Sequence, residues 1–219
     1  MCVRVTQIVL MVSLFLLLLI SIMINSGGDI NPWVIIFFYY SLWGMMISLF
    51  SVIFTIWANY TDRAFIVAFY LVEASLAANL FIFIFYWGAI FWVLRATLFK
   101  DLWEQGKKET YYWLLTYQVL VHVLPLLSTL LNILVTRIKP RRSDWFRMIL
   151  VLFPLYMFAN VLGGLTVGNG TIYQVENWKT QPGVSFLIFV GVGLLQGGIY
   201  YLAAWAFEKL REKHDYEAE

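Results

Sequence analysis

Six apolar stretches alternate with short polar segments along the chain. A helix that crosses the hydrocarbon of a bilayer needs about 20 mainly apolar residues. Six stretches meet this requirement: residues 5–24, 33–57, 64–94, 111–136, 145–165 and 182–207. A charged tail, residues 208–219, follows the last of them. The pattern predicts an all-α membrane protein whose six transmembrane helices form one bundle, within a single polytopic membrane domain over residues 1–219.

The composition supports this assignment, because 62% of the residues are hydrophobic, 13% are charged and the mean hydropathy is +0.77. A soluble domain of this length has too little interior to hide so much apolar side chain. The first stretch follows Arg4 and resembles a cleaved signal peptide in that respect. Its apolar core is long, however, and Asn25-Ser26-Gly27-Gly28 is a poor cleavage site. We therefore expect a retained helix.

The charges predict an orientation. Six spans put both termini on one side, and that side collects about two thirds of the 15 Lys and Arg, with the densest cluster at residues 137–142. Short basic loops stay on the inner side of a membrane, so we expect both termini inside. Residues 98–112 mix charged side chains with apolar ones at three- and four-residue spacing. Part of this segment is therefore expected to lie in the membrane surface as a short amphipathic helix.

Several kinds of site are excluded by residue counts. Cys2 is the only cysteine, and His122 and His214 are the only histidines. This excludes disulfide frameworks and Cys-based metal sites and argues against a multi-His site, so we expect no metal and no cofactor. The chain has no Gly-rich phosphate loop and no basic, aromatic surface of the nucleic-acid type. The expected partners are membrane lipids and, as an open alternative, other membrane-protein subunits, but not nucleic acid.

Small residues and one acidic residue inside the spans are interpreted as structural. Gly164 and Gly168, like Gly193 and Gly197, lie four residues apart. This spacing permits close helix approach, and we interpret it as packing. Glu73 falls inside the third stretch. A glutamate there is more often an interfacial residue or an interhelical hydrogen-bonding group than an acid catalyst.

One histidine lies inside an otherwise uncharged span. Residues 111–136 contain His122 and Pro125 but no Asp, Glu, Lys or Arg. A titratable imidazole in a lipid-spanning helix costs free energy and so raises a functional hypothesis. Ser41 lies eight residues past Trp33, and His122 lies nine residues past Trp113. At about 1.5 Å rise per residue, both lie roughly 12–14 Å below the outer interface.

Equal depth makes nucleophilic chemistry possible. A neutral imidazole takes the proton of a hydroxyl, which activates the oxygen of Ser41 as a nucleophile. Gln118, one turn before His122, lies on the same face and is placed to orient the ring. Pro125 frees the carbonyl of the preceding turn. The alternative stays open that Ser41 bonds back to its own helix and that His122 only bonds across helices.

The order of several short motifs resembles a known family. Tyr40-Ser41-Leu42-Trp43 opens the second stretch, Phe91-Trp92 ends the third, and His122-x-x-Pro125 lies in the fourth. A basic loop follows, and then Gly170-Thr171-Ile172-Tyr173. This order resembles the androgen-induced and androgen-dependent family of six-span membrane proteins. That resemblance implies hydrolysis of esters of hydroxy fatty acids by a threonine nucleophile and a histidine within the membrane. His122 matches the histidine, and Ser41 stands where the family has its threonine.

The family resemblance implies a location in the endoplasmic reticulum or the plasma membrane.

Two other functions remain open at this point. A non-catalytic accessory or structural subunit of a larger complex, such as one of the respiratory chain in the inner mitochondrial membrane, also fits the many interfacial aromatic residues. A channel or transporter fits less well, because the spans carry few charged residues and no convincing internal repeat.

Overall fold

Every described element of the chain is helical. The computed structural model describes residues 2–25, 39–136, 138–166 and 177–217. The long helices are α1 (Cys2–Asn25), α3 (Tyr40–Ala58), α4 (Asp62–Phe85), α7 (Lys108–Val135), α8 (Trp145–Thr166) and α9 (Pro182–Glu217). The short ones are η1 (Tyr86–Ile90), α5 (Phe91–Leu94), η2 (Arg95–Phe99), α6 (Lys100–Glu104) and η3 (Arg142–Asp144). The all-α class is confirmed, while residues 33–38 of the expected second span lie outside the described residues.

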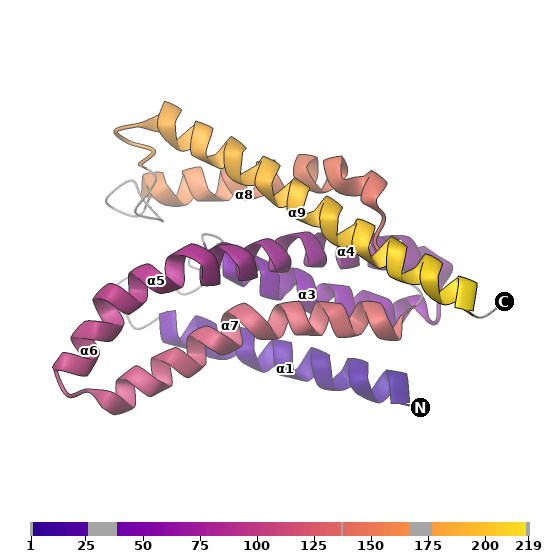
Figure 1. The fold of residues 1–219 in the computed structure, drawn as a ribbon, viewed down its shortest axis with the longest axis horizontal. Coiled ribbons are helices and arrows are strands. Elements are labelled where there is room, and N and C mark those ends of the chain that lie inside the picture. Colours follow the sequence, from indigo (N-terminus) through magenta and orange to yellow (C-terminus); the bar gives the residue numbers. More distant parts are fainter. Residues whose placement is uncertain (1, 26–38, 137, 167–176, 218–219) are drawn as a thin grey trace.

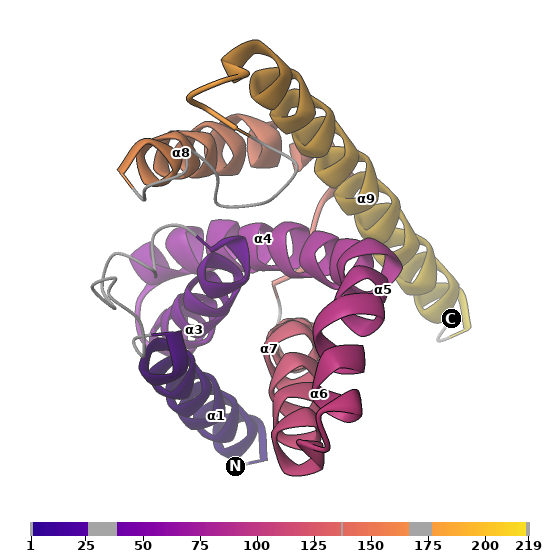
Figure 2. The same cartoon turned by 90° about the vertical axis from the view of Figure 1, so that its left-hand side faces the viewer.

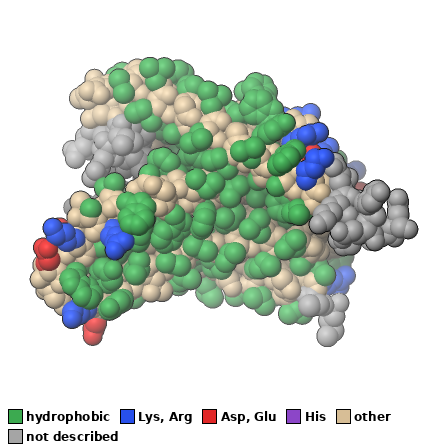
Figure 3. Space-filling model, viewed as in Figure 1, with side chains coloured by type: hydrophobic (Ala, Val, Ile, Leu, Met, Phe, Trp, Pro, Cys, Tyr) green, Lys and Arg blue, Asp and Glu red, His purple; other side chains and the backbone are tan. Residues whose placement is uncertain are grey.

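Within the described residues, six helical runs are long and apolar enough to cross a membrane. Large apolar side chains cover the outside of the bundle; Leu134, Phe158 and Leu187 are exposed by 72, 69 and 69%. On the face in Figure 3, apolar side chains cover the middle, and the charged side chains gather at the two ends. A largely apolar surface of this kind needs lipid around it. The protein is therefore an integral, multi-pass membrane protein.

The helices form two groups that share α4 (Figures 1 and 2). Helices α1, α3, α4 and α7 pack against one another, and α8 and α9 pair with each other on the opposite side of α4. Figure 1 shows that α1 begins and α9 ends at the same end of the bundle. This agrees with an even number of crossings. That this end faces the inner side stays a prediction.

The third span is longer than expected, because the helix that begins at Asp62 runs on to Glu104. It ends in a tight turn where Gly106 has a φ of 71°. Within the segment expected to be amphipathic, residues 100–104 form α6, which is continuous with the third span. That this part lies in the membrane surface stays a prediction. No proline occurs between Asp62 and Gly106, and the one glycine there, Gly88, lies inside η1, so the helical run continues. Trp103 then packs against Tyr111 of α7, with ring centroids 5.5 Å apart.

Glycines allow the closest helix contacts. A Cβ on Gly44 would lie 2.5 Å from Asn79 Oδ1 and 2.6 Å from the Ile82 side chain, so a larger residue there would force these side chains, or the two helices, to shift. Added Cβ atoms on Gly193 and Gly197 would likewise collide with Phe153 and Ile149 of α8. The packing role of this second glycine pair is therefore confirmed. Gly168, from the first pair, lies outside the described residues.

We expect the Gly44→Ala variant to lose about 1–3 kcal/mol of stability, the usual range for an overpacked core. The added methyl group must displace the Asn79 amide or separate α3 from α4. Thermal unfolding of the purified protein in detergent measures the loss. The Gly198→Ala variant is the matched control, because a Cβ there meets no atom within 4 Å. Equal melting temperatures for the two variants would contradict the close approach at Gly44.

Candidate active site between helices α3, α4 and α7

A row of buried polar side chains connects α3, α4 and α7. Ser48 Oγ lies 2.9 Å from Ser75 Oγ and 3.2 Å from Thr129 Oγ1, and the Ser75 and Thr129 oxygens are 2.6 Å apart. The Asn79 amide donates to Ser48 Oγ at 2.7 Å and to the Gly44 carbonyl at 3.2 Å. The side chains of Ser48, Ser75, Thr129 and Asn79 are at most 3% exposed. Hydrogen bonds of this kind hold membrane helices together where no hydrophobic force does so.

The same row continues toward α1. Asn132 Nδ2 donates to Ser51 Oγ at 3.2 Å, and Thr55 Oγ1 donates to Asn132 Oδ1 at 3.0 Å. The Gln7 amide donates to Thr55 Oγ1 at 3.3 Å. Four helices, α1, α3, α4 and α7, therefore meet through buried polar contacts.

These contacts fix how α3 and α7 are aligned. Ser48 pairs with Thr129 and Ser51 pairs with Asn132, and in both pairs the residues are 81 positions apart. Both pairings advance in the same direction, so the two helices run parallel. The same offset, applied to Ser41, reaches His122. Seven residues are close to two full turns, so Ser41 shares the face of Ser48, and His122 shares the face of Thr129.

Packing at that level agrees with the alignment. Leu42 and Met45 of α3 share one buried apolar cluster with Val121 of α7. Leu42 and Val121 are the immediate neighbours of Ser41 and His122, and both site residues are half-buried. Ser41 and His122 are both described residues, and no hydrogen bond joins them. Their action as a pair stays a prediction.

Two contacts hold the ring of His122. Its Nδ1 lies 2.9 Å from the Gln118 carbonyl oxygen. Its face stacks on the Tyr86 ring, with centroids 3.5 Å apart and planes 8° from parallel. A carbonyl oxygen only accepts, so Nδ1 carries the proton and Nε2 carries the lone pair. Gln118 thus holds the ring through its backbone, where the sequence had indicated its side chain.

Pro125 contributes to the polar row and leaves α7 unbroken from Lys108 to Val135. Its carbonyl oxygen accepts a hydrogen bond from Thr129 Oγ1 at 2.8 Å and a longer one from Ser48 Oγ at 3.4 Å. Pro125 lies about one turn after His122 and one turn before Thr129, so its carbonyl joins the polar row close to the histidine.

A second polar centre lies around Glu73, which is fully buried. Its Oε1 accepts from the Arg141 backbone N–H and from the Tyr200 hydroxyl, both at 2.8 Å. The Arg141 side chain donates in turn to Asp144. Glu73 thus links α4 to the α7–α8 connection and to α9. Its interpretation as an interhelical hydrogen-bonding group is confirmed.

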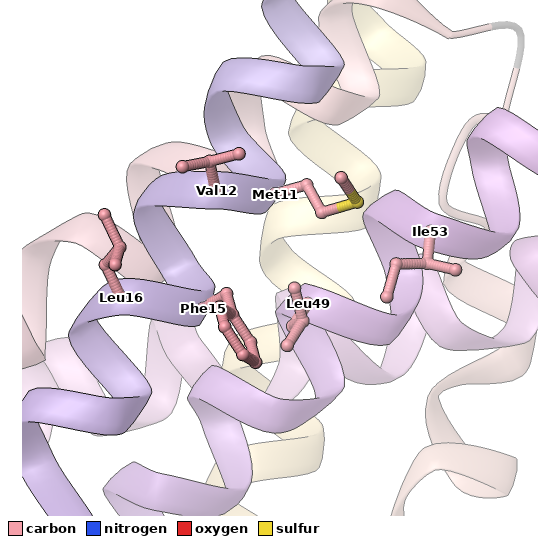
Figure 4. A pocket seen from close by; sticks show the side chains of 6 residues that line it. All are labelled: Met11, Val12, Phe15, Leu16, Leu49 and Ile53. Carbon is pink, nitrogen blue, oxygen red and sulfur yellow. The ribbon is translucent and has the colours of Figure 1, made fainter.

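An apolar groove lies between α1 and α3 (Figure 4), with a volume of about 260 Å³. Its lining residues are Met11, Val12, Phe15, Leu16, Leu49 and Ile53. None of these side chains titrates or acts as a nucleophile, so the groove offers space for hydrocarbon and no chemistry. Among the described residues, no three His, Cys, Asp or Glu side chains gather as a protein metal site requires.

Comparisons with protein-family models, with curated proteins and with solved structures give no match. The site is therefore assigned from its own geometry.

Tyr86 is the site residue that the sequence did not identify. It lies in an aromatic run where nothing distinguishes it from its neighbours.

The polar row, by contrast, had a detectable signal in the sequence. Ser41, Ser48 and Thr55 recur every seven residues in one apolar stretch, and His122 and Thr129 repeat this spacing in another. Polar residues at that interval share one helix face, which favours an interhelical seam.

We expect the Glu73→Leu variant to be destabilised by about 1–3 kcal/mol, because the Arg141 N–H then lacks its buried acceptor. The Glu73→Gln variant keeps an oxygen at Oε1 and should retain most of the stability. Melting temperatures in detergent compare the two. Glu208→Gln is the control, since Glu208 pairs with Arg142 at the exposed surface, where ion pairs contribute little. Equal destabilisation by Gln and Leu at position 73 would contradict the assignment.

Proposed function

We propose that the protein is an intramembrane hydrolase of lipid esters, with Ser41 as nucleophile and His122 as general base. The observation that carries this proposal is the alignment of α3 and α7. Two hydrogen-bonded pairs set an offset of 81 residues, and the same offset relates Ser41 to His122. Catalytic hydrogen bonds are often long before substrate binds and tighten in the complex.

The state of His122 also supports this role. With Nδ1–H held by the Gln118 carbonyl, Nε2 is the basic nitrogen. Nε2 takes the Ser41 proton as Oγ attacks the ester carbonyl carbon. The proton then passes from Nε2 to the departing alkoxide, which leaves as the alcohol. The acyl group stays on Oγ of Ser41 as an acyl-serine. A water molecule, activated by Nε2, releases the fatty acid and restores the Ser41 hydroxyl.

The substrate class follows from where the two residues lie. Half-buried side chains inside a lipid-facing bundle are reached sideways from the bilayer by hydrophobic esters. The family resemblance narrows the proposed substrates to esters of hydroxy fatty acids. Ser41 supplies a primary hydroxyl in place of the secondary hydroxyl of threonine, and both are competent nucleophiles.

Labelling by an alkyl fluorophosphonate tests the proposal. The reagent transfers its phosphoryl group to an activated hydroxyl with loss of fluoride. We expect wild-type protein in detergent to be labelled, and the Ser41→Ala and His122→Ala variants to lose labelling by at least about a hundredfold, the usual size of general-base effects. The Ser41→Thr variant should keep labelling. His214→Ala is the matched histidine control and should behave like the wild type.

Labelling that survives both alanine variants, or a wild type that is never labelled, would contradict the hydrolase. Those outcomes would favour the alternative of a non-catalytic subunit.

A further inference from the structure

Two hydrogen-bond donors from consecutive residues, the first of which stacks on His122, are buried without a partner. The Tyr86 hydroxyl and the Trp87 indole Nε1 are both inaccessible, and neither makes a hydrogen bond. The Tyr86 side chain as a whole is only 3% exposed. A buried polar group without a partner costs free energy, and native structures rarely contain one without a reason. Other buried polar atoms, such as Gln7 Oε1 and Glu73 Oε2, also lack a partner, but these two donors belong to consecutive residues and one of them lies against His122.

The backbone at this point is also unusual. Tyr86 and Trp87 open η1, which is one of two π-helical turns, with η2, inside the long run from α4 to α6. Such turns are rare within α-helices and are frequently found at functional sites. The wider turn changes the direction in which the following side chains leave the helix. Here it contains the residue whose ring covers His122.

The geometry brings the Tyr86 hydroxyl to the imidazole. Because the two rings are stacked with centroids 3.5 Å apart, the hydroxyl at the edge of one ring lies beside the other ring. The Trp87 ring stands perpendicular to Tyr86, with centroids 5.2 Å apart and an interplanar angle of 89°. A ligand atom that accepts from Tyr86 is therefore next to the base of the proposed reaction.

We propose that Tyr86 Oη and Trp87 Nε1 form a donor pair that binds the carbonyl oxygen of an acyl lipid beside His122. The pair rests on the proposed function only for its role in turnover, because binding itself needs no reaction. An indole N–H is a donor only, so the group that it selects must be an acceptor. Inside a bilayer, the ester carbonyl of a lipid is an acceptor without charge. During hydrolysis the same donors stabilise the negative charge that develops on that oxygen.

Competition between an ester and its ether analogue tests this site without turnover. Full-length Ser41→Ala protein in detergent is given a fluorescent long-chain ester, which is displaced by a long-chain ester or by the ether that lacks the carbonyl oxygen. We expect the ester to displace the probe at about three- to tenfold lower concentration, the worth of a typical hydrogen bond. Adding Tyr86→Phe should make the two competitors nearly equal, and Trp87→Phe should reduce the preference.

The control pair is Tyr112 and Trp113, which form the same dipeptide on α7 and are exposed by 55 and 54%. Tyr112→Phe and Trp113→Phe should leave the ester preference unchanged. The melting temperature of lipid-free protein is the second measurement. Tyr86→Phe should leave it unchanged or raise it, because the removed hydroxyl has no partner in the folded protein.

An ester preference that Tyr86→Phe leaves intact would overturn the inference, and so would a clear drop in the melting temperature of that variant. These outcomes are separate from those for the hydrolase. If fluorophosphonate labelling fails while the ester preference depends on Tyr86, the hydrolase is wrong and the carbonyl-binding site stands. If labelling depends on Ser41 and His122 but ester and ether compete equally, the hydrolase stands and this site is wrong.

Discussion

The arrangement of this protein depends on the hydrogen bonds between buried hydroxyl and amide groups where α3, α4 and α7 meet. Lipid tails are as apolar as leucine, so apolar contacts alone do not select one alignment of two membrane helices over another. Ser48 is bonded to both Ser75 and Thr129, and Asn79 adds bonds to α3. A shift of α3 by one residue would leave several of these groups without partners in hydrocarbon. The alignment is thus set by satisfaction of polar groups, and the level of Ser41 and His122 follows from it.

The second pair of helices is attached by a different device. Helix α9 packs on α4 and on α8, where Gly193 and Gly197 allow close approach. Glu73 of α4 also fixes the position of α9, because its Oε1 accepts hydrogen bonds from the Tyr200 hydroxyl and the Arg141 backbone N–H. The chain between α7 and α8 is held in place by the same oxygen. One buried carboxyl group therefore positions three segments of the chain, far from His122, and separates the structural acid from the proposed reactive site.

How much of this was predictable depends on the kind of signal. The six spans follow from apolar length, because the bilayer permits few alternatives. The equal depth of Ser41 and His122 follows from topology and helical rise. The rotation of each helix about its own axis does not follow, since it is set by partners such as Thr129 and Asn132 that lie on other helices. Tyr86 was missed because the π-helical turn η1 decides which ring reaches His122. The sequence YWGAI does not predict a π-helical turn.

The free-energy balance around His122 favours a site that waits for a ligand over one that only holds the fold. Within the structural group formed by Ser48, Ser75 and Thr129, every hydroxyl has a partner. Beside His122 the pattern reverses, because Tyr86 and Trp87 retain unused donors while Gln118 secures only one side of the imidazole. An unused hydroxyl on the ring that stacks against His122 is physically reasonable if a lipid carbonyl completes its hydrogen bonding, as we propose.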